Sequence, residues 1–107
     1  MFVCKFLAFA LGAEDLINPI TGWNWSTDDL LKTGDRIYTL ERMFINREGF
    51  DRKDDTLPLR LLKEPMPEGP VKGHVVELEK MLDEYYEARG WKNGKPTKEK
   101  LEELELT

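Results

Sequence analysis

Cys4 is the one residue of this chain with an obvious chemical role open to it, and His74 is its single histidine. A thiolate is a soft ligand that suits iron–sulfur clusters and zinc. A lone cysteine in an apolar helix, however, usually behaves as a small buried side chain, so residue type alone leaves both interpretations open. His74 has no nucleophile or second base beside it in the sequence, which favours a capping or solvated histidine. We therefore predict no catalytic residue in this chain.

A single cysteine limits what Cys4 could bind. It excludes an internal disulfide and any metal site that takes several thiolates from this chain. Any further ligands must come from elsewhere. Phosphate-binding glycine loops, Walker patterns, HExxH and a serine-nucleophile elbow are absent from the sequence. The acid-rich helix faces lack the ligand spacing of a calcium loop, so we interpret them as solvated surface.

The three tryptophans, Trp23, Trp25 and Trp91, could form a stacking platform for a base or a sugar. Each lies beside a glycine or a predicted helix cap, however, where packing explains it. We therefore expect them to pack within the protein.

Length, charge and composition limit the classes of partner that this chain could bind. The 107 residues allow one small domain, residues 1–107, with no room for a second independent core. The net charge of -5 and pI near 4.9 provide no basic surface for nucleic acid or an anionic membrane. The apolar run from Phe2 to Leu11 is far shorter than the roughly 20 residues that span a bilayer. Lys5 interrupts that run, which argues against a signal peptide. We expect a cytoplasmic protein that binds neither nucleic acid nor membrane.

The candidate residues named above must be positioned by helices that the sequence predicts. Residues 2–11 are apolar nearly all round and are followed by Gly12, which predicts a buried helix covered on every side. Residues 13–18 could add one helical turn that Pro19 would end. Ser26 is the predicted cap of a long helix reaching Gly49. Its apolar positions recur at helical spacing and predict a core helix: Leu30, Gly34, Ile37, Leu40 and Phe44.

The second half is predicted to be less regular. Residues 50–72 carry four prolines and predict a connecting strap with at most one helical turn near residues 57–62. A second amphipathic helix should follow, closed by Gly90, with Trp91 folding back onto Tyr86. Its predicted buried face is Val75, Leu78, Leu82 and Tyr85.

Thr97 is the predicted cap of a last helix over residues 98–106. No segment alternates convincingly as a strand. The predicted class is all-α: a small, irregular multi-helical domain with a proline-rich connecting strap.

Several segments together resemble the C-terminal end of the tungsten-containing aldehyde:ferredoxin oxidoreductase family. They occur in the family's order and spacing over essentially the whole chain: Thr21-Gly22-Trp23, Leu30-Leu31, Arg36-Ile37, Leu40-Glu41-Arg42, Phe44, Arg47-Glu48-Gly49-Phe50, Arg52, Asp54-Asp55, Leu57-Pro58, Arg60, Pro65-Met66-Pro67-Glu68-Gly69-Pro70, Met81-Leu82, Tyr85-Tyr86, Arg89-Gly90-Trp91 and Pro96-Thr97.

Cys4-Lys5-Phe6 is similar to the family segment whose cysteine supplies the fourth ligand to a [4Fe-4S] cluster. The resemblance implies that Cys4 is this metal and cofactor ligand. Phe2 stands where the family commonly has glycine, and the family's pterin-contacting aspartate would fall before Met1.

The resemblance also implies an activity for the complete enzyme. It is the oxidation of an aldehyde to a carboxylic acid at a tungsten, or sometimes molybdenum, bis-pterin centre, with electron transfer through the cluster to ferredoxin. The implied partners are the pterin-binding and three-cysteine portions of the enzyme. This chain alone is expected to bind no cofactor and to be inactive. The alternative is a stand-alone α-helical protein-interaction module without catalytic activity.

Overall fold

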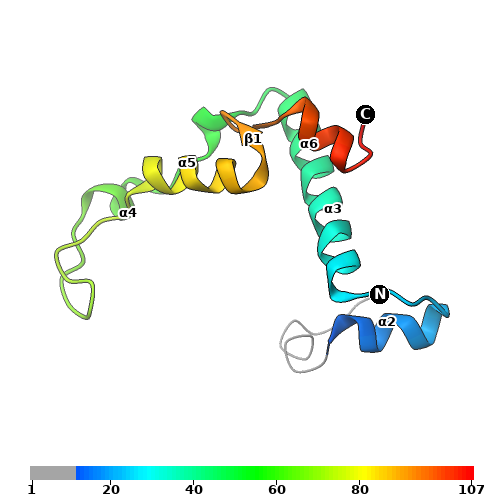
Figure 1. The fold of residues 1–107 in the computed structure, drawn as a ribbon. Coiled ribbons are helices and arrows are strands. Elements are labelled where there is room, and N and C mark those ends of the chain that lie inside the picture. Colours follow the sequence, from blue (N-terminus) through cyan, green and yellow to red (C-terminus); the bar gives the residue numbers. More distant parts are fainter. Residues whose placement is uncertain (1–11) are drawn as a thin grey trace. The chain divides into compact units, whose positions relative to one another are not determined.

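The computed structural model describes residues 12–107 (Figure 1). The predicted helix at residues 2–11, including Cys4, lies outside the described residues. The chain divides into two compact units, the first ending at Thr39 and the second running from Leu40 to Thr107. The prediction of one domain over residues 1–107 stays a prediction.

Helix α2, Ala13–Thr21, is longer than the sequence predicted, because Pro19 lies inside it. Proline removes one helical hydrogen bond, the one that residue 19 would donate to the carbonyl of residue 15. Asp15 is exposed, so water can satisfy that carbonyl. The helix ends at Gly22 instead, whose left-handed backbone lets its N–H reach the Asn18 carbonyl at 2.9 Å.

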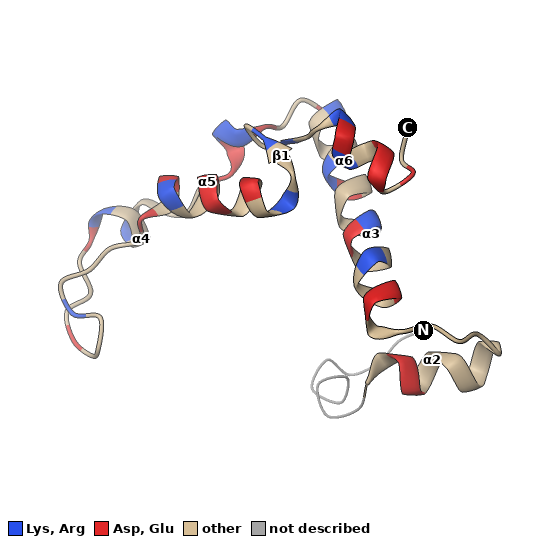
Figure 2. Ribbon diagram, viewed as in Figure 1, with Lys and Arg blue, Asp and Glu red and all other residues tan. Residues whose placement is uncertain are grey.

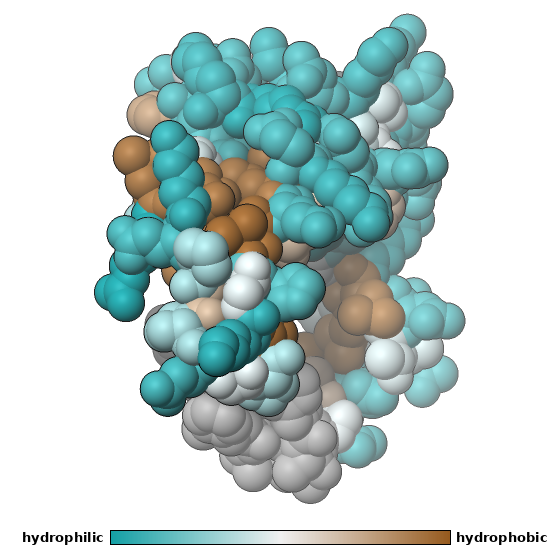
Figure 3. All heavy atoms as spheres, turned by 90° about the vertical axis from the view of Figure 1, so that its left-hand side faces the viewer, coloured by the Kyte–Doolittle hydropathy of each residue, from teal (hydrophilic) through white to brown (hydrophobic). Residues whose placement is uncertain are grey.

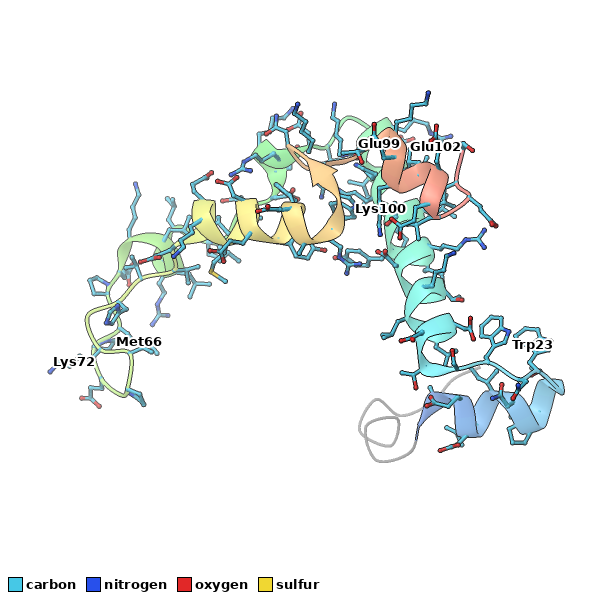
Figure 4. All side chains as sticks on the ribbon, in the orientation of Figure 1. Trp23, Met66, Lys72, Glu99, Lys100 and Glu102 are labelled. Atoms are coloured by element: carbon cyan, nitrogen blue, oxygen red, sulfur yellow. The ribbon has the colours of Figure 1, made fainter. Side chains whose placement is uncertain are left out.

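The turn between α2 and the next helix is held by side chains. The Asn18 amide donates to the Trp25 carbonyl at 2.8 Å and accepts from the Trp25 N–H at 3.0 Å. Trp23, labelled in Figure 4, stacks on Trp25 with ring centroids 4.6 Å apart. The Thr27 hydroxyl donates to Glu14 at 2.6 Å. The Trp23–Trp25 pair therefore packs on itself, although the Trp23 side chain is half exposed.

Helix α3, Thr27–Arg47, begins where the sequence predicted. The Ser26 hydroxyl accepts from the Asp29 N–H at 3.3 Å, and the Asp29 carboxylate accepts from the Ser26 N–H at 2.8 Å. This reciprocal arrangement satisfies two amides of the first turn and confirms the predicted cap.

The apolar stripe of α3 does not form a core. Ile37, Leu40 and Phe44 are each more than half exposed, whereas Thr39 is fully buried. The prediction of a core helix is therefore wrong for this chain by itself. The physical reason lies in the second unit, where polar contacts hold the opposite side of the helix.

The proline-rich strap is as irregular as the sequence predicted. It contains one short α-helix, α4, Leu59–Lys63, near the predicted turn, and also a 3-10 helix η1, Arg52–Asp54, which exceeds the predicted limit of one helical turn. A hairpin-like loop follows, in which the Met66 N–H donates to the His74 carbonyl at 3.0 Å. The Val76 N–H then donates to the Leu61 carbonyl at 3.0 Å, so the loop returns to α4.

Helix α5, Leu78–Arg89, ends at Gly90, which takes the predicted left-handed conformation. Tyr86 and Trp91 are buried and their rings stack 6.3 Å apart, which confirms the predicted contact. The predicted inner face was wrong in part. Val75 precedes the helix, and Tyr85 is exposed although the edge of its ring meets Trp91, with centroids 5.8 Å apart.

A two-residue hairpin, β1 Trp91–Lys92 and β2 Lys95–Pro96, was not predicted. Helix α6, Lys98–Glu103, follows it, and Thr97 caps this helix by accepting from the Lys100 N–H. Leu104 behind α6 is almost fully buried. Because the hairpin is so short, the predicted all-α class is confirmed.

Apolar side chains are spread widely over the surface of the described part of the chain. Among its hydrophobic residues, those that are buried are Tyr86, Trp91 and Leu104. Figure 3, viewed from the side of α4, shows apolar side chains in brown patches between hydrophilic ones. Figure 2 shows acidic and basic residues interspersed along α3, α5 and α6. The exposed large apolar residues of the second unit are Leu40, Phe44, Ile45, Phe50, Leu59, Leu61, Met66, Val71, Val75, Met81 and Tyr85.

Candidate functional site

The predicted ligand, Cys4, lies outside the described residues, so its surroundings stay a prediction. Within residues 12–107, no three histidine, cysteine or acidic side chains gather as a metal site would require. His74 is exposed in the loop after α4. Figure 4 shows Met66 and Lys72 in this same loop, at some distance from α6. Nothing in the loop places a nucleophile with the histidine.

The second unit instead contains a polar cluster that we call the Arg42 cluster: Arg42, Asp55, Tyr86 and the Gly94 carbonyl. The guanidinium of Arg42 donates two parallel bonds to the Asp55 carboxylate, at 2.8 and 2.5 Å. Its Nε donates to the Gly94 carbonyl at 2.8 Å. The Tyr86 hydroxyl donates to the same Asp55 carboxylate. One half-buried carboxylate thus joins α3, the strap and α5, while Arg42 also reaches the hairpin turn.

The electrostatics of the cluster keep each group in its ordinary protonation state. Hydrogen bonds from Arg42 hold the pKa of Asp55 below its usual value. Burial, together with the bond to Asp55, raises the pKa of Tyr86 to about 12. The Asp55 carboxylate raises the pKa of Arg42. An ionised acid, a protonated phenol and a fixed cation have no proton to exchange near neutral pH, so this geometry suits structure rather than acid–base catalysis.

Arg52 extends the cluster along α5. Its guanidinium contacts Glu79 at 2.8 Å and Asp83 at 2.6 Å, one helical turn apart. It also lies 5.3 Å from the centre of the Tyr86 ring. Arg42 lies similarly over the Trp91 ring at 5.6 Å. Both arginines therefore cover the buried aromatic pair while their charges are neutralised by acids.

A hollow of about 700 Å³ adjoins the Arg42 cluster. Its charged lining alternates in sign, and Arg52 in its wall is already held by Glu79. Such a lining presents no excess charge toward a ligand of either sign. The lining residues are Asp51, Arg52, Lys53, Asp55, Thr56, Leu62, Val76, Leu78, Glu79, Asn93 and Lys95.

Sequence reasoning missed the Arg42 cluster, although one of its parts had a local signal. Asn93-Gly94 is a strong hairpin-turn dipeptide, and both residues take the positive φ values, 53° and 79°, that such a turn requires. That turn presents the Gly94 carbonyl to Arg42. The pairing of Arg42 with Asp55 had no comparable signal, because it depends on how the strap returns to α3.

The described residues thus form helices with a polar cluster that has a structural role. Their exposed apolar residues outnumber their buried ones. A family model described as aldehyde ferredoxin oxidoreductase, domains 2 and 3, matches residues 1–106. The chain therefore belongs to the aldehyde ferredoxin oxidoreductase family.

Curated relatives agree with this membership. The chain is 54% identical over 107 residues to a tungsten-containing aldehyde ferredoxin oxidoreductase of Pyrococcus furiosus, and 52% identical over 107 residues to one of Thermococcus kodakarensis. An aliphatic sulfonate oxidoreductase, WOR-like subunit, of Pyrococcus furiosus is 36% identical over 115 residues. Each match covers 95% of this chain but 18% of the relative.

The chain thus spans about a fifth of the length of these relatives. None of its described helices is long and apolar enough to cross a membrane.

Proposed function

We propose that this chain is the C-terminal helical portion of a tungsten-containing aldehyde:ferredoxin oxidoreductase and works only as part of that enzyme. The observation that carries the proposal is a match over 95% of the chain to 18% of a tungsten-containing relative. The activity of the whole enzyme would be oxidation of an aldehyde to a carboxylic acid, with electrons passing to ferredoxin. The higher identity to the aldehyde enzymes, 54% against 36% for the sulfonate relative, supports an aldehyde substrate.

Within this proposal Cys4 is the fourth ligand of a [4Fe-4S] cluster. A cluster of this type is held by four thiolates, and this chain has one cysteine. The donor set therefore fits as one ligand of four, and the other three must come from the remainder of the enzyme. When bound, the cluster supplies one-electron transfer between the tungsten bis-pterin centre and ferredoxin. The chain's own contribution is one thiolate and a helical wall.

A chimera tests the proposal. The matching segment of the Pyrococcus furiosus relative is replaced by residues 1–107 of this chain, and tungsten content, iron content and aldehyde oxidation are measured. We expect the chimera to load both metals and to oxidise aldehydes with ferredoxin as acceptor. The same relative with the segment deleted is the matched control and should do neither. A chimera that behaves like the deleted relative would contradict the proposal and favour a stand-alone interaction module.

Cys4→Ser in the chimera tests the ligand separately. Loss of the cluster should lower the iron content by about four atoms per chimera, because a [4Fe-4S] centre needs all its thiolates. Unchanged iron in a chimera that still contains tungsten would remove Cys4 as a ligand while leaving the family role intact.

A further inference from the structure

Helix α3 presents an apolar groove to solvent within the second unit. Leu40 and Phe44 are 55% and 57% exposed, and Ile45 is 41% exposed. With Glu41 they line a groove of about 370 Å³, the α3 groove. Residues four apart on a helix form one ridge, so Leu40 with Phe44 and Glu41 with Ile45 make two adjacent ridges. Side chains of another element can insert between such ridges.

Polar contacts on the opposite side of α3 fix which side of the helix faces solvent. Arg42 and Asn46, on the other side, both donate to the Gly94 carbonyl, at 2.8 and 3.3 Å. Arg42 is held further by two bonds to Asp55. Rotating α3 so that its apolar ridges faced the rest of the second unit would break these hydrogen bonds. The half-buried polar groups that make them would then be left unsatisfied. The polar contacts thus hold the α3 groove outward.

We propose that the α3 groove is a docking surface for the remainder of the same oxidoreductase, and that apolar side chains of that remainder fill it. This inference rests on the proposed function. The relatives that the chain matches are more than five times its length, since the match covers 18% of them, so a large surface is available to cover the groove.

Charge and area argue against a second copy of this chain as the occupant. A two-fold contact centred on the groove would bring the two Glu41 carboxylates together, and each copy carries a net charge of -5. The three apolar side chains expose on the order of 300 Å², well below the roughly 800 Å² that each partner of a stable complex buries. A contact this small is effective when both surfaces belong to one polypeptide, because the effective concentration is then high.

Thiol labelling tests the docking surface directly. Ile45→Cys is introduced into this chain alone and into the chimera, and labelling of that position is followed by mass spectrometry of its peptide. We expect labelling to be at least about tenfold slower in the chimera, because the groove is covered there. Glu64→Cys, at a charged and exposed position directly after α4, is the matched control and should label equally fast in both. Equal rates for Ile45→Cys in a tungsten-loaded chimera would overturn the inference.

Phe44→Glu provides a second measurement. Because Phe44 is exposed in this chain, the substitution should leave the helical circular dichroism of the chain unchanged. In the chimera it should lower the yield of assembled, tungsten-containing protein at least about fivefold. Normal assembly of this variant would overturn the inference, whereas failure of the unsubstituted chimera would contradict the proposed function instead. Labelling that slows with rising concentration of the chain alone would indicate a second copy as occupant and also overturn it.

Discussion

At the scale of single residues, the Asp55 carboxylate links two helices of the second unit, α3 and α5. It accepts from Arg42 and from Tyr86, and these two residues belong to different helices. The pKa of Asp55 is lowered, so its contribution to stability is present above the unfolded value of about 3.9 and is lost as pH falls through the lower folded value. The cluster therefore stabilises the second unit throughout the neutral range.

Asp55→Asn should destabilise this chain by about 2 kcal/mol, because it leaves the Arg42 guanidinium half-buried without its counter-charge. The midpoint of urea unfolding measures this change. Glu64→Gln is the control, since the Arg60–Glu64 pair is exposed and should contribute less than about 0.5 kcal/mol. Equal losses of stability in the two variants would show that the Arg42 cluster contributes no more than an exposed ion pair.

Tyr86 provides a pH-dependent test. Burial and Asp55 raise its pKa from 10.0 to about 12, so the folded state favours the protonated phenol. This contribution is fully present below pH 10 and should be lost as pH rises from about 10 to 12. Titration of tyrosinate absorbance in the folded chain should show a step near pH 12 that Tyr86→Phe removes. Tyr38→Phe is the control and should keep the step near pH 12. Loss of that step in Tyr38→Phe would contradict its assignment to Tyr86.

At the scale of elements, the turn between β1 and β2 positions the Arg42 cluster. Gly94 has a φ of +79°, and a Cβ there would lie 2.8 Å from Nη2 of Arg42 and 3.1 Å from the backbone nitrogen of Arg52. The turn therefore requires glycine for two reasons, its backbone conformation and its close approach to α3 and η1. The short hairpin is thus an organising element despite its size.

Gly94→Ala should cost about 3 kcal/mol, of which about 1 is backbone strain and the rest displacement of Arg42 and Arg52. Gly69→Ala is the matched control: its φ is +90° but a Cβ would meet nothing within 4 Å, so only the strain of about 1 kcal/mol is expected. Chemical unfolding of both variants gives the difference. If the two costs agree, close packing at Gly94 has no role.

At the scale of the whole molecule, exposed apolar residues outnumber buried ones within residues 12–107. Isolated soluble domains seldom expose continuous apolar surface without a binding role. The α3 groove and the widely spaced apolar side chains of the strap agree with a chain that contributes one portion of a larger enzyme.

The chain made by itself should therefore associate through the exposed apolar side chains of the strap, outside the α3 groove. Sedimentation at rising concentration should show larger species, and sodium sulfate should promote them because it strengthens apolar burial. Replacing both Leu59 and Met66 with serine should reduce the association, whereas Arg60→Ser, at an exposed polar position, should not. A monomer at all concentrations, with or without sulfate, would contradict this expectation.

Much of the local structure could be predicted from the sequence. The Ser26 and Thr97 caps, the left-handed Gly90 and the contact of Trp91 with Tyr86 were all predicted, because each depends on residues within a few positions of one another. Pro19 was predicted to end its helix, which was wrong because the loss of one backbone hydrogen bond is tolerated in an exposed helix. The Asn93-Gly94 turn carried a local signal and was overlooked.

The sequence by itself determined the all-α class, the order of helices and the family of this protein, because propensity, capping and motif order are properties of short segments. Only the tertiary structure decided which side of α3 faces outward. That choice depends on Arg42 meeting Asp55 and the Gly94 carbonyl, 13 and 52 residues further along the chain. Helical periodicity identified the apolar face of α3, but burial depends on what lies opposite it, and contacts between distant residues decide that.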